Sequence, residues 1–428
     1  MKGLIAKYTS INLIIRIVTG LIIGIVLALI IPSLMAGCGE GTAAAGVTSF
    51  LDGLVNAFGT LFVGALTGVA PLVVFCLVST ALCGAKVGQG GSMKRVIFLY
   101  IIGTVCAAFL AVVMSTLIPV DMAFAPDVDT SSYTPPKDLG QVITTLLTNL
   151  VTNPIASIAN ANYLGILFWA ILFGLALRSF ANEGLRHGFQ AVTNAFTQIV
   201  RWIIECAPFG IMGLIYGAVS TSGASIFIDY GWLLIVLVAS MILMFLVVNP
   251  LIVFLNTHMN PYPLVFKCIT RSAVTAFFTR SSAANIPVNM DLCKDMELDE
   301  DQYSISIPLG ATINMEGAAI TISVMTLAAC HTLGIQVDFV EALLLSILSA
   351  VGACGASGVA GGSLLLIPMA CSLFGISNDI AMSVVGVGFI IGVVQDSVET
   401  ALNSSGDVMF AATAEFHDRM KRGEKVEF

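Results

Sequence analysis

Long apolar runs constrain the fold of this chain more than any other feature of its sequence. Six are candidate spans, at residues 11–34, 47–83, 95–120, 142–177, 184–220 and 230–255, and Pro71, Pro154 and Pro208 are expected to kink them. Each exceeds the roughly 20 residues that a helix needs to cross the hydrocarbon core of a bilayer. Because 57% of all residues are hydrophobic and only 10% are charged, the composition is not that of a soluble globular protein. The runs therefore predict an all-α polytopic membrane protein embedded in the lipid bilayer.

Two later runs are broken near their middles by polar or glycine-rich residues. The run at residues 263–286 is interrupted at 279–282, and the run at 339–376 is interrupted at 352–358. Each half is too short to span, so each run predicts a re-entrant hairpin that enters and leaves on the same side. Such backbone is tolerated at membrane depth only where protein buries it or where it lines a cavity, and paired interruptions point to a transporter site.

Two further runs predict spanning helices with unusual polar content. Residues 303–330 are interrupted at 310–317, where two glycines accompany Asn314 and Glu316, a pattern that favours local unwinding. Residues from 380 onward begin apolar and continue into the polar stretch 393–407. Counting these two, the sequence predicts eight transmembrane helices plus two re-entrant helical hairpins.

The polar stretch 393–407 places its acids on one face of a helix. Asp396, Glu399, Thr400, Asn403 and Asp407 recur at i, i+3, i+4, i+7 and i+11. A charged side chain at mid-membrane costs about 2.5 to 3.5 kcal/mol, so cations should meet these carboxylates. We interpret the stripe as the lining of an ion and substrate site. The alternative, a solvated helix outside the bilayer, is disfavoured by the apolar flanks.

Oxygen-rich residues near the stripe suit a hard cation such as sodium. Unwinding would free the carbonyls of Gly310 and Asn314, and the end of the stripe adds Asn403 and Asp407. Sodium takes carbonyl, carboxylate and hydroxyl oxygens, as calcium and magnesium do. The simpler alternative is that Asn314 and Glu316 only hydrogen-bond across helices.

A zwitterionic substrate needs an anion for its ammonium group and donors for its carboxylate. Asp396 suits the ammonium group. Ser281 and Ser282, with their backbone N–H groups, and Asn403 suit the carboxylate.

Other classes of site are poorly supported. The 10 cysteines show no CxxC spacing, and only 4 histidines occur, so neither a disulfide framework nor a transition-metal centre is expected. The net charge of −8 argues against nucleic acid as a partner. Lys and Arg fall on alternate turns, which predicts that both termini are cytoplasmic, and the first apolar run is too long for a signal peptide and predicts an uncleaved helix.

Four motifs together resemble a known family. They are TRSSAANIP at residues 279–287, NMEGA at 314–318, the glycine-rich tip at 352–362 and QDSVETALNSSGD at 395–407. In this order they resemble the dicarboxylate/amino acid:cation symporter family, and most nearly its serine/threonine:sodium symporters. The likeness is strong over the second half of the chain and extends to the first half only in hydrophobic pattern.

The resemblance implies a homotrimer in a bacterial cytoplasmic (inner) membrane, with inverted repeats and an elevator-type mechanism. A fixed scaffold would comprise residues 1–93 (helices 1 and 2) and 141–223 (helices 4 and 5). A mobile transport domain would comprise residues 94–120 (helix 3) and 229–428, which hold helix 6, hairpin one, helix 7, hairpin two, helix 8 and a cytoplasmic tail.

The resemblance also implies roles for individual residues. Substrate contacts map to Ser281, Ser282, Ala318, Gly355, Ala356, Ser357, Gly358, Asp396, Glu399, Thr400 and Asn403. Co-transported sodium ions (Na+) map to Gly310, Asn314, Asn403 and Asp407, with Thr312 at a second site and Glu316, Tyr100 and Thr104 at a third.

Two departures from the family pattern bear on the substrate. Acidic-substrate members have Arg where this chain has Glu399 and Thr where it has Ala318, so a second carboxylate would meet like charge. We therefore expect sodium-coupled symport of L-serine and L-threonine, with Arg280 neutralising Glu399. The alternatives are a sodium- or proton-coupled dicarboxylate or glutamate symporter, a passive channel, and an intramembrane serine protease suggested by the GxSG pattern at residues 355–358 with His331.

Overall fold

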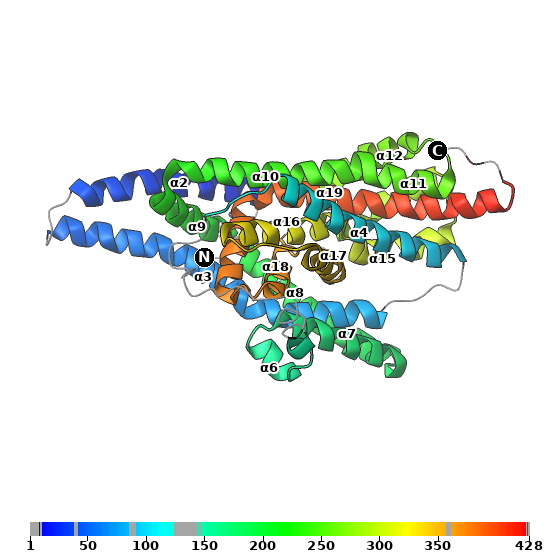
Figure 1. The fold of residues 1–428 in the computed structure, drawn as a ribbon, viewed down its shortest axis with the longest axis horizontal. Helices are drawn as coiled ribbons and strands as arrows, with labels where there is room; N and C mark the ends of the chain where they lie inside the picture. The colour runs from blue at the N-terminus through cyan, green and yellow to red at the C-terminus, as the bar shows by residue number, and fades with distance from the viewer. Residues whose placement is uncertain are drawn as a thin grey trace.

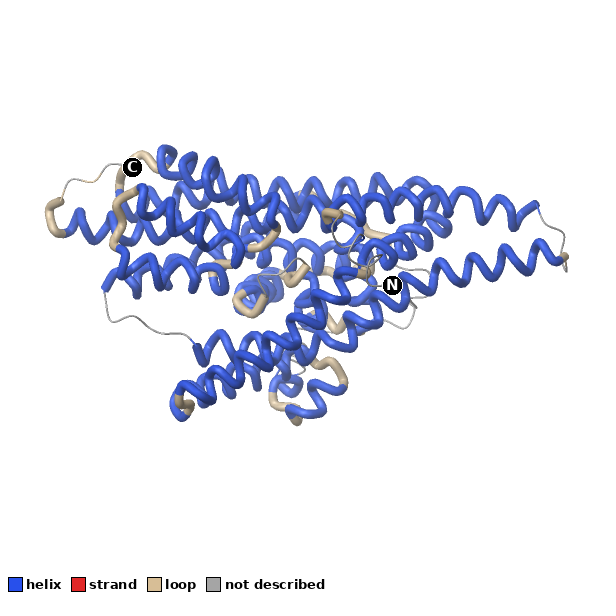
Figure 2. Tube along the Cα trace, turned by 180° about the vertical axis from the view of Figure 1, so that it is seen from behind, coloured by secondary structure: helices blue, strands red, loops and turns tan. Residues whose placement is uncertain are grey.

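The computed structural model describes residues 8, 11–37, 42–84, 91–123, 144, 147–356, 361–424 and 426. All regular secondary structure in these residues is helical (Figures 1 and 2). Seven helices are long and apolar enough to cross a membrane, or eight if a bent pair counts as one span. The all-α membrane fold is thus confirmed for the described part of the chain.

One set of helices, termed here the N-terminal group, packs together along α3. It contains α2 (Leu13–Gly37), α3 (Ala43–Gly84), α6 (Pro154–Ala159), α7 (Tyr163–Phe180), α8 (Glu183–Glu205) and α9 (Ala207–Ser222). α8 and α9 form the bent pair, with an angle of 56° between them, because Pro208 in the first turn of α9 cannot continue the helix of α8. α2 and α3 extend beyond the other helices at one end of the molecule (left in Figure 1).

The candidate span at residues 142–177 is not one continuous helix, and Pro154, an expected kink point, is the first residue of α6. In the described part of this run, α6 and α7 are separate helices joined by a turn in which Ala161 has φ +52°. Asn153 caps α6 by accepting from Ile155 N, and Asn162 caps α7 by accepting from Gly165 N. Side-chain caps of this kind compete with a continuous helix, which is why the run breaks despite its apolar composition.

A second set, the core group, surrounds the last long helix. It contains α4 (Gly91–Leu117), the continuous span Ile226–Thr257 built from α10 (Ile226–Leu243), η2 (Met244–Val248) and α11 (Asn249–Thr257), and the final helix α19 (Asn378–Lys421). A short turn, η1 (Gly223–Ser225), joins α9 to α10. α16 and α19 lie at the centre and are buried along most of their length, whereas α2 exposes Ile15 and Leu29, as a lipid-facing helix would.

The interruptions predicted at 279–282 and 310–317 are confirmed. α17 (Phe339–Ala353) ends within the one predicted at 352–358, of which residues 357 and 358 lie outside the described residues. The first hairpin contains α12 (Tyr262–Cys268), η3 (Ile269–Ala273) and α13 (Val274–Thr279), then turns at Arg280 and Ser281 into α14 (Ser282–Asp295). α15 (Glu300–Ile313) and α16 (Glu316–Thr332) are separated at Asn314 and Met315. The second hairpin runs from α17 to η4 (Leu364–Leu366) and α18 (Ile367–Leu373).

Candidate functional site

The acidic stripe lies on the continuous helix α19 and faces the interior of the core group. Its members are at most 6% exposed: Asp396, Glu399, Thr400, Asn403 and Asp407. The prediction that these side chains are sequestered from lipid is therefore confirmed. Thr400 Oγ1 donates to the carbonyl of Asp396 at 2.8 Å, so its hydroxyl is engaged within its own helix.

The break between α15 and α16 meets α19 where sodium ligands are predicted. Asn314 Nδ2 donates to the Asn403 carbonyl at 3.0 Å and to Asp407 Oδ1 at 3.1 Å. Asn314 Oδ1 and Asp407 Oδ2 are buried without a hydrogen-bond partner in the described structure. An unpaired buried oxygen is unfavourable, and each of these two contacting side chains carries one, which is a donor type that a hard cation prefers.

Gly310 and Tyr100 close the same junction. A Cβ atom on Gly310 would lie 2.7 Å from Asp407 Oδ1 and 2.8 Å from Tyr100 Oη. Tyr100 Oη lies within hydrogen-bond distance of the carbonyls of Ser306, at 3.2 Å, and Asp407, at 3.0 Å. The structure therefore brings together Gly310, Tyr100 and the Asn314–Asp407 contact. The prediction that unwinding frees the Gly310 carbonyl is wrong, because Gly310 lies inside α15 and its carbonyl accepts from Asn314 N at 2.8 Å.

Glu316 lies beside this junction and has one partner that sequence reasoning missed. Its Oε2 accepts from Asn249 Nδ2 at 2.8 Å, and its Oε1 is buried without a partner in the described structure. A Cβ atom on Gly103 would lie only 2.5 Å from Oε1, so α4 approaches Glu316 closely. Thr104 Oγ1 instead donates to the Tyr100 carbonyl at 2.8 Å, within its own helix.

The residues predicted around the second hairpin are only partly described. Thr312 is exposed and donates to Leu309 O at 2.7 Å, so its hydroxyl is not in the junction with Asp407. Cys354 Sγ approaches Ile313 O at 3.4 Å, which places the end of α17 beside Thr312. Gly355 and Ala356 follow there, whereas the predicted contacts Ser357 and Gly358 lie outside the described residues.

Asp396 is held between the tips of the two hairpins. Arg280 Nε lies 2.7 Å from Asp396 Oδ2, with the two side chains 10% and 5% exposed, and Gly361 N donates to Asp396 Oδ1 at 3.1 Å. The predicted pairing of Arg280 with Glu399 is therefore wrong. Arg280 sits in the left-handed region at φ +51°, and the tip it occupies meets α19 at the level of Asp396.

Glu399, one turn further along α19, is bound by neutral donors. Its Oε2 accepts from Thr321 Oγ1 at 2.7 Å, Ser363 Oγ at 2.8 Å and Gln395 Nε2 at 2.5 Å. None of these three donors was predicted. The i, i+4 spacing of Gln395 and Glu399 was a visible signal, whereas Thr321 and Ser363 reach Glu399 only through tertiary packing.

The predicted carboxylate donors lie at the start of α14 and on α19. Ser281 caps α14 by accepting from Ala284 N at 3.2 Å, and Ser282 is 3% exposed. Asn403 Oδ1 accepts from Gly317 N at 2.7 Å, and among the described residues its Nδ2 reaches only Met315 Sδ, at 3.5 Å. The Asn403 amide N–H groups thus remain available to a stronger acceptor. Ala318, predicted to face the substrate side chain, is fully buried.

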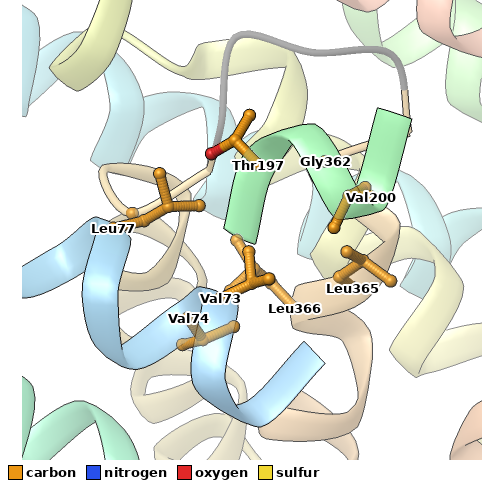
Figure 3. A pocket seen from close by; sticks show the side chains of 9 residues that line it. Val73, Val74, Leu77, Thr197, Val200, Gly362, Leu365 and Leu366 are labelled. Atoms are coloured by element: carbon orange, nitrogen blue, oxygen red, sulfur yellow. The ribbon is translucent and has the colours of Figure 1, made fainter. Parts of the chain in front are cut away.

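The N-terminal group forms an apolar wall against both hairpins. A cavity beside Arg280, Gly361 and Asp396 is lined on the opposite side by Ile17, Ile204, Ala207 and Ile211. A second pocket, shown in Figure 3, lies between Val73, Val74 and Leu77 of α3, Thr197 and Val200 of α8, and Gly362, Leu365 and Leu366 of the second hairpin. In both places the N-terminal group faces the core group mainly with apolar side chains.

The site draws on oxygens of several kinds rather than on a cluster of acids. Among the described residues, no group of three or more His, Cys, Asp or Glu is placed to hold a metal ion. Carbonyls, amides and single carboxylates at a helix break are the donor set expected for an alkali cation that must leave again.

Comparison with known proteins agrees with the family suggested by the motifs. The model of the sodium:dicarboxylate symporter family matches residues 13–415. A protein of Bifidobacterium adolescentis named serine/threonine transporter SstT is 53% identical over 426 residues, which cover 100% of this chain and 94% of that protein. The chain belongs to the sodium:dicarboxylate symporter family.

Proposed function

We propose that this protein takes up serine and threonine by sodium-coupled symport. The observation that carries the proposal is the contact between the break at Asn314 and the α19 stripe at Asn403 and Asp407, where buried oxygens are left unpaired. The family name supports sodium coupling, and the name of the Bifidobacterium relative supports the substrate. Because family and relative are transporters, the chain is not an enzyme, and the protease alternative is dropped.

Glu399 decides between neutral and acidic substrates. Arg280 is engaged by Asp396, and no other Lys or Arg of the described chain forms an ion pair with the stripe. A substrate carboxylate placed beside Glu399 would therefore meet like charge without a guanidinium partner, a loss of several kcal/mol or roughly a hundredfold or more in affinity. A small neutral side chain avoids this loss, so the dicarboxylate and glutamate alternatives are disfavoured.

Sodium and substrate would bind in order. Sodium binding at Asn314 and Asp407 fixes the break against α19 and thereby orients Asn403. The substrate ammonium group then displaces Arg280 from Asp396, while the substrate carboxylate accepts from Asn403 Nδ2 and from the N–H groups at the start of α14. Closure of the second hairpin at Gly361 completes the site.

We assign the N-terminal group to a fixed scaffold and the core group to a mobile, elevator-like domain. This division is supported by the placement of both hairpins, the break and α19 within the core group, and by the apolar wall that α3, α8 and α9 present to it. The family pattern further suggests a homotrimer in the bacterial inner membrane. The distribution of Lys and Arg suggests that both termini are cytoplasmic.

Uptake into proteoliposomes tests the proposal. Labelled serine and threonine should accumulate under an inward sodium gradient but not under potassium or choline, and labelled glutamate and succinate should not accumulate. Unlabelled serine inside should accelerate entry of labelled serine, which a passive channel would not allow. Serine uptake that is equally fast in potassium would refute sodium coupling, and accumulation of glutamate would refute the substrate assignment.

A further inference from the structure

Glu399 and three side chains that donate to it form a polar cluster inside the apolar core group. Thr321 lies on α16, Ser363 follows the tip of the second hairpin, and Gln395 lies on α19 one turn before Glu399. All four are at most 6% exposed. Burying so many polar groups is unfavourable unless their hydrogen bonds are satisfied. Here the donors are satisfied through Glu399 Oε2 and Thr321 Oγ1, whereas the buried Gln395 Oε1 has no partner among the described residues.

The hydrogen bonds of the cluster are unevenly distributed over the Glu399 carboxyl group. Oε2 accepts from Thr321, Ser363 and Gln395, and Gln395 Nε2 also lies 2.7 Å from Thr321 Oγ1. Oε1 accepts no hydrogen bond from any residue that the structure describes. Because the hydrogen bonds to Oε2 hold the carboxyl group in one orientation, Oε1 occupies a fixed position in which it can accept from a bound donor.

The second hairpin is hydrogen-bonded to two acids of α19 that lie three residues apart. Gly361 N donates to Asp396 Oδ1 at 3.1 Å, and Ser363 Oγ donates to Glu399 Oε2 at 2.8 Å. Side chains three residues apart on a helix have Cβ atoms about 5–6 Å apart. Two donors on adjacent carbons of a small molecule can reach both acids through hydrogen bonds of roughly 2.8 Å each. Serine and threonine carry such a pair, the ammonium group and the β-hydroxyl.

We propose that Glu399 recognises the substrate hydroxyl through Oε1 and that Thr321, Ser363 and Gln395 are positioning residues for this recognition. The proposal rests on the proposed transport of serine and threonine and names the residues that set its selectivity. Because Ser363 belongs to the second hairpin, the carboxyl group that meets the hydroxyl also holds this hairpin closed. A substrate with a hydroxyl therefore favours closure more than one without it.

The test compares serine with alanine, which lacks only the hydroxyl. Ser363→Ala and Thr321→Val each remove one donor to Glu399 at little change in volume, while Ser363→Thr and Thr321→Ser keep it. Ser346→Ala serves as control, because Ser346 is a buried serine of the same hairpin whose hydroxyl, among the described residues, bonds only to Ala342 O of its own helix. KM and kcat for serine, threonine and alanine are measured in proteoliposomes at saturating sodium.

Loss of a hydrogen bond to a charged group should raise the KM for serine and threonine about tenfold. The KM for alanine should change less than about twofold, so the preference for serine over alanine falls by roughly the same tenfold factor. kcat should change less than KM. The hydroxyl-retaining variants should restore the wild-type preference, and the control should match wild type throughout.

Other outcomes separate the two proposals. Equal losses for serine and alanine, or an unchanged preference in both donor-removing variants, would overturn the role of the cluster while leaving sodium-coupled serine uptake intact. Wild-type protein that does not take up serine would overturn the proposed function itself. If Ser363→Ala and Thr321→Val do not elute as folded protein on size exclusion, Gln395→Met removes the third donor, and its serine preference decides the question.

Discussion

Replacing Gly310 by alanine tests the cation site most directly. Gly310 lies in the last turn of α15, and a Cβ atom there would lie 2.7 Å from Asp407 Oδ1, 2.8 Å from Tyr100 Oη and 2.9 Å from Asp407 Cγ. Comfortable contacts of a carbon atom are about 3.5 Å or longer. The Asp407 carboxyl group must therefore shift by about 0.7 Å, well beyond the roughly 0.2 Å tolerance of a metal–ligand distance.

Two effects of this substitution on stability oppose each other. Alanine is favoured over glycine inside a helix by about 1 kcal/mol, whereas overpacking a buried site costs about 1–3 kcal/mol. The net change in the free energy of unfolding is then within about 2 kcal/mol. The displaced Asp407 carboxyl group, in contrast, would weaken sodium binding directly. A loss of about 1.4–2.8 kcal/mol in the free energy of sodium binding corresponds to a tenfold to hundredfold weaker apparent sodium affinity.

The assay is a sodium titration of serine uptake, paired with thermal unfolding in detergent. Gly231→Ala is the matched control, because Gly231 lies inside α10 and a Cβ atom there would meet nothing within 4 Å. The control should keep the wild-type sodium titration and lose no stability. A Gly310→Ala protein with a wild-type sodium titration would refute the assignment of this junction as a sodium site.

Three further predictions follow from the same contacts. Asp407→Asn should weaken the apparent sodium affinity at least tenfold, checked by the same titration, while Asp379→Asn at the exposed start of α19 should not. Arg280→Ala and Asp396→Asn should each lower the thermal stability of the substrate-free protein. The double variant should lose less stability than the sum of the two single losses, because both substitutions remove the same ion pair. Additive losses would show that the two side chains do not form this pair. Gly355→Ala should slow serine uptake, since its Cβ atom would lie 2.3 Å from Val78 Cγ2, and adding Val78→Ala should restore the rate if this clash is the cause.

Local composition was sufficient to predict the breaks in the fold. Polar residues at 279–282 and glycines at 310–317 interrupt apolar runs, and the structure turns or unwinds at both places. The stripe on α19 was equally predictable, because the helical period alone puts Asp396 and Asp407 on one face. In the run at residues 142–177, Pro154 predicted a kink, but the second break, at Asn162, was not predicted, because an asparagine cap there outweighs an apolar composition that looks continuous.

Partner choice within the site was not predictable in the same way. The sequence places Asp396 and Glu399 three residues apart on one face, so both were open to Arg280. Which acid it meets depends on how far the first hairpin reaches along α19, and that distance is set by packing of the hairpin arms. Asn249, Thr321 and Ser363 are likewise separated by 36 to 78 residues from the acids that they contact, and no local pattern marks them.

The different partners of the buried acids explain why a cation should be required for transport. Asp396 has a guanidinium partner, whereas Glu316, Glu399 and Asp407 are bound only by neutral donors among the described residues. Each unpaired charge at membrane depth costs about 2.5–3.5 kcal/mol on insertion scales. A substrate ammonium group that displaces Arg280 merely exchanges one cation for another at Asp396, so it leaves the other acids uncompensated. In the proposed mechanism, sodium would add the missing positive charge beside Asp407. The oxygens that it would bind lie close to Asn403 along the chain or across the helix contact, so bound sodium would both lower the energy of the buried acids and orient a substrate ligand. By linkage, bound substrate would then raise the affinity for sodium in return.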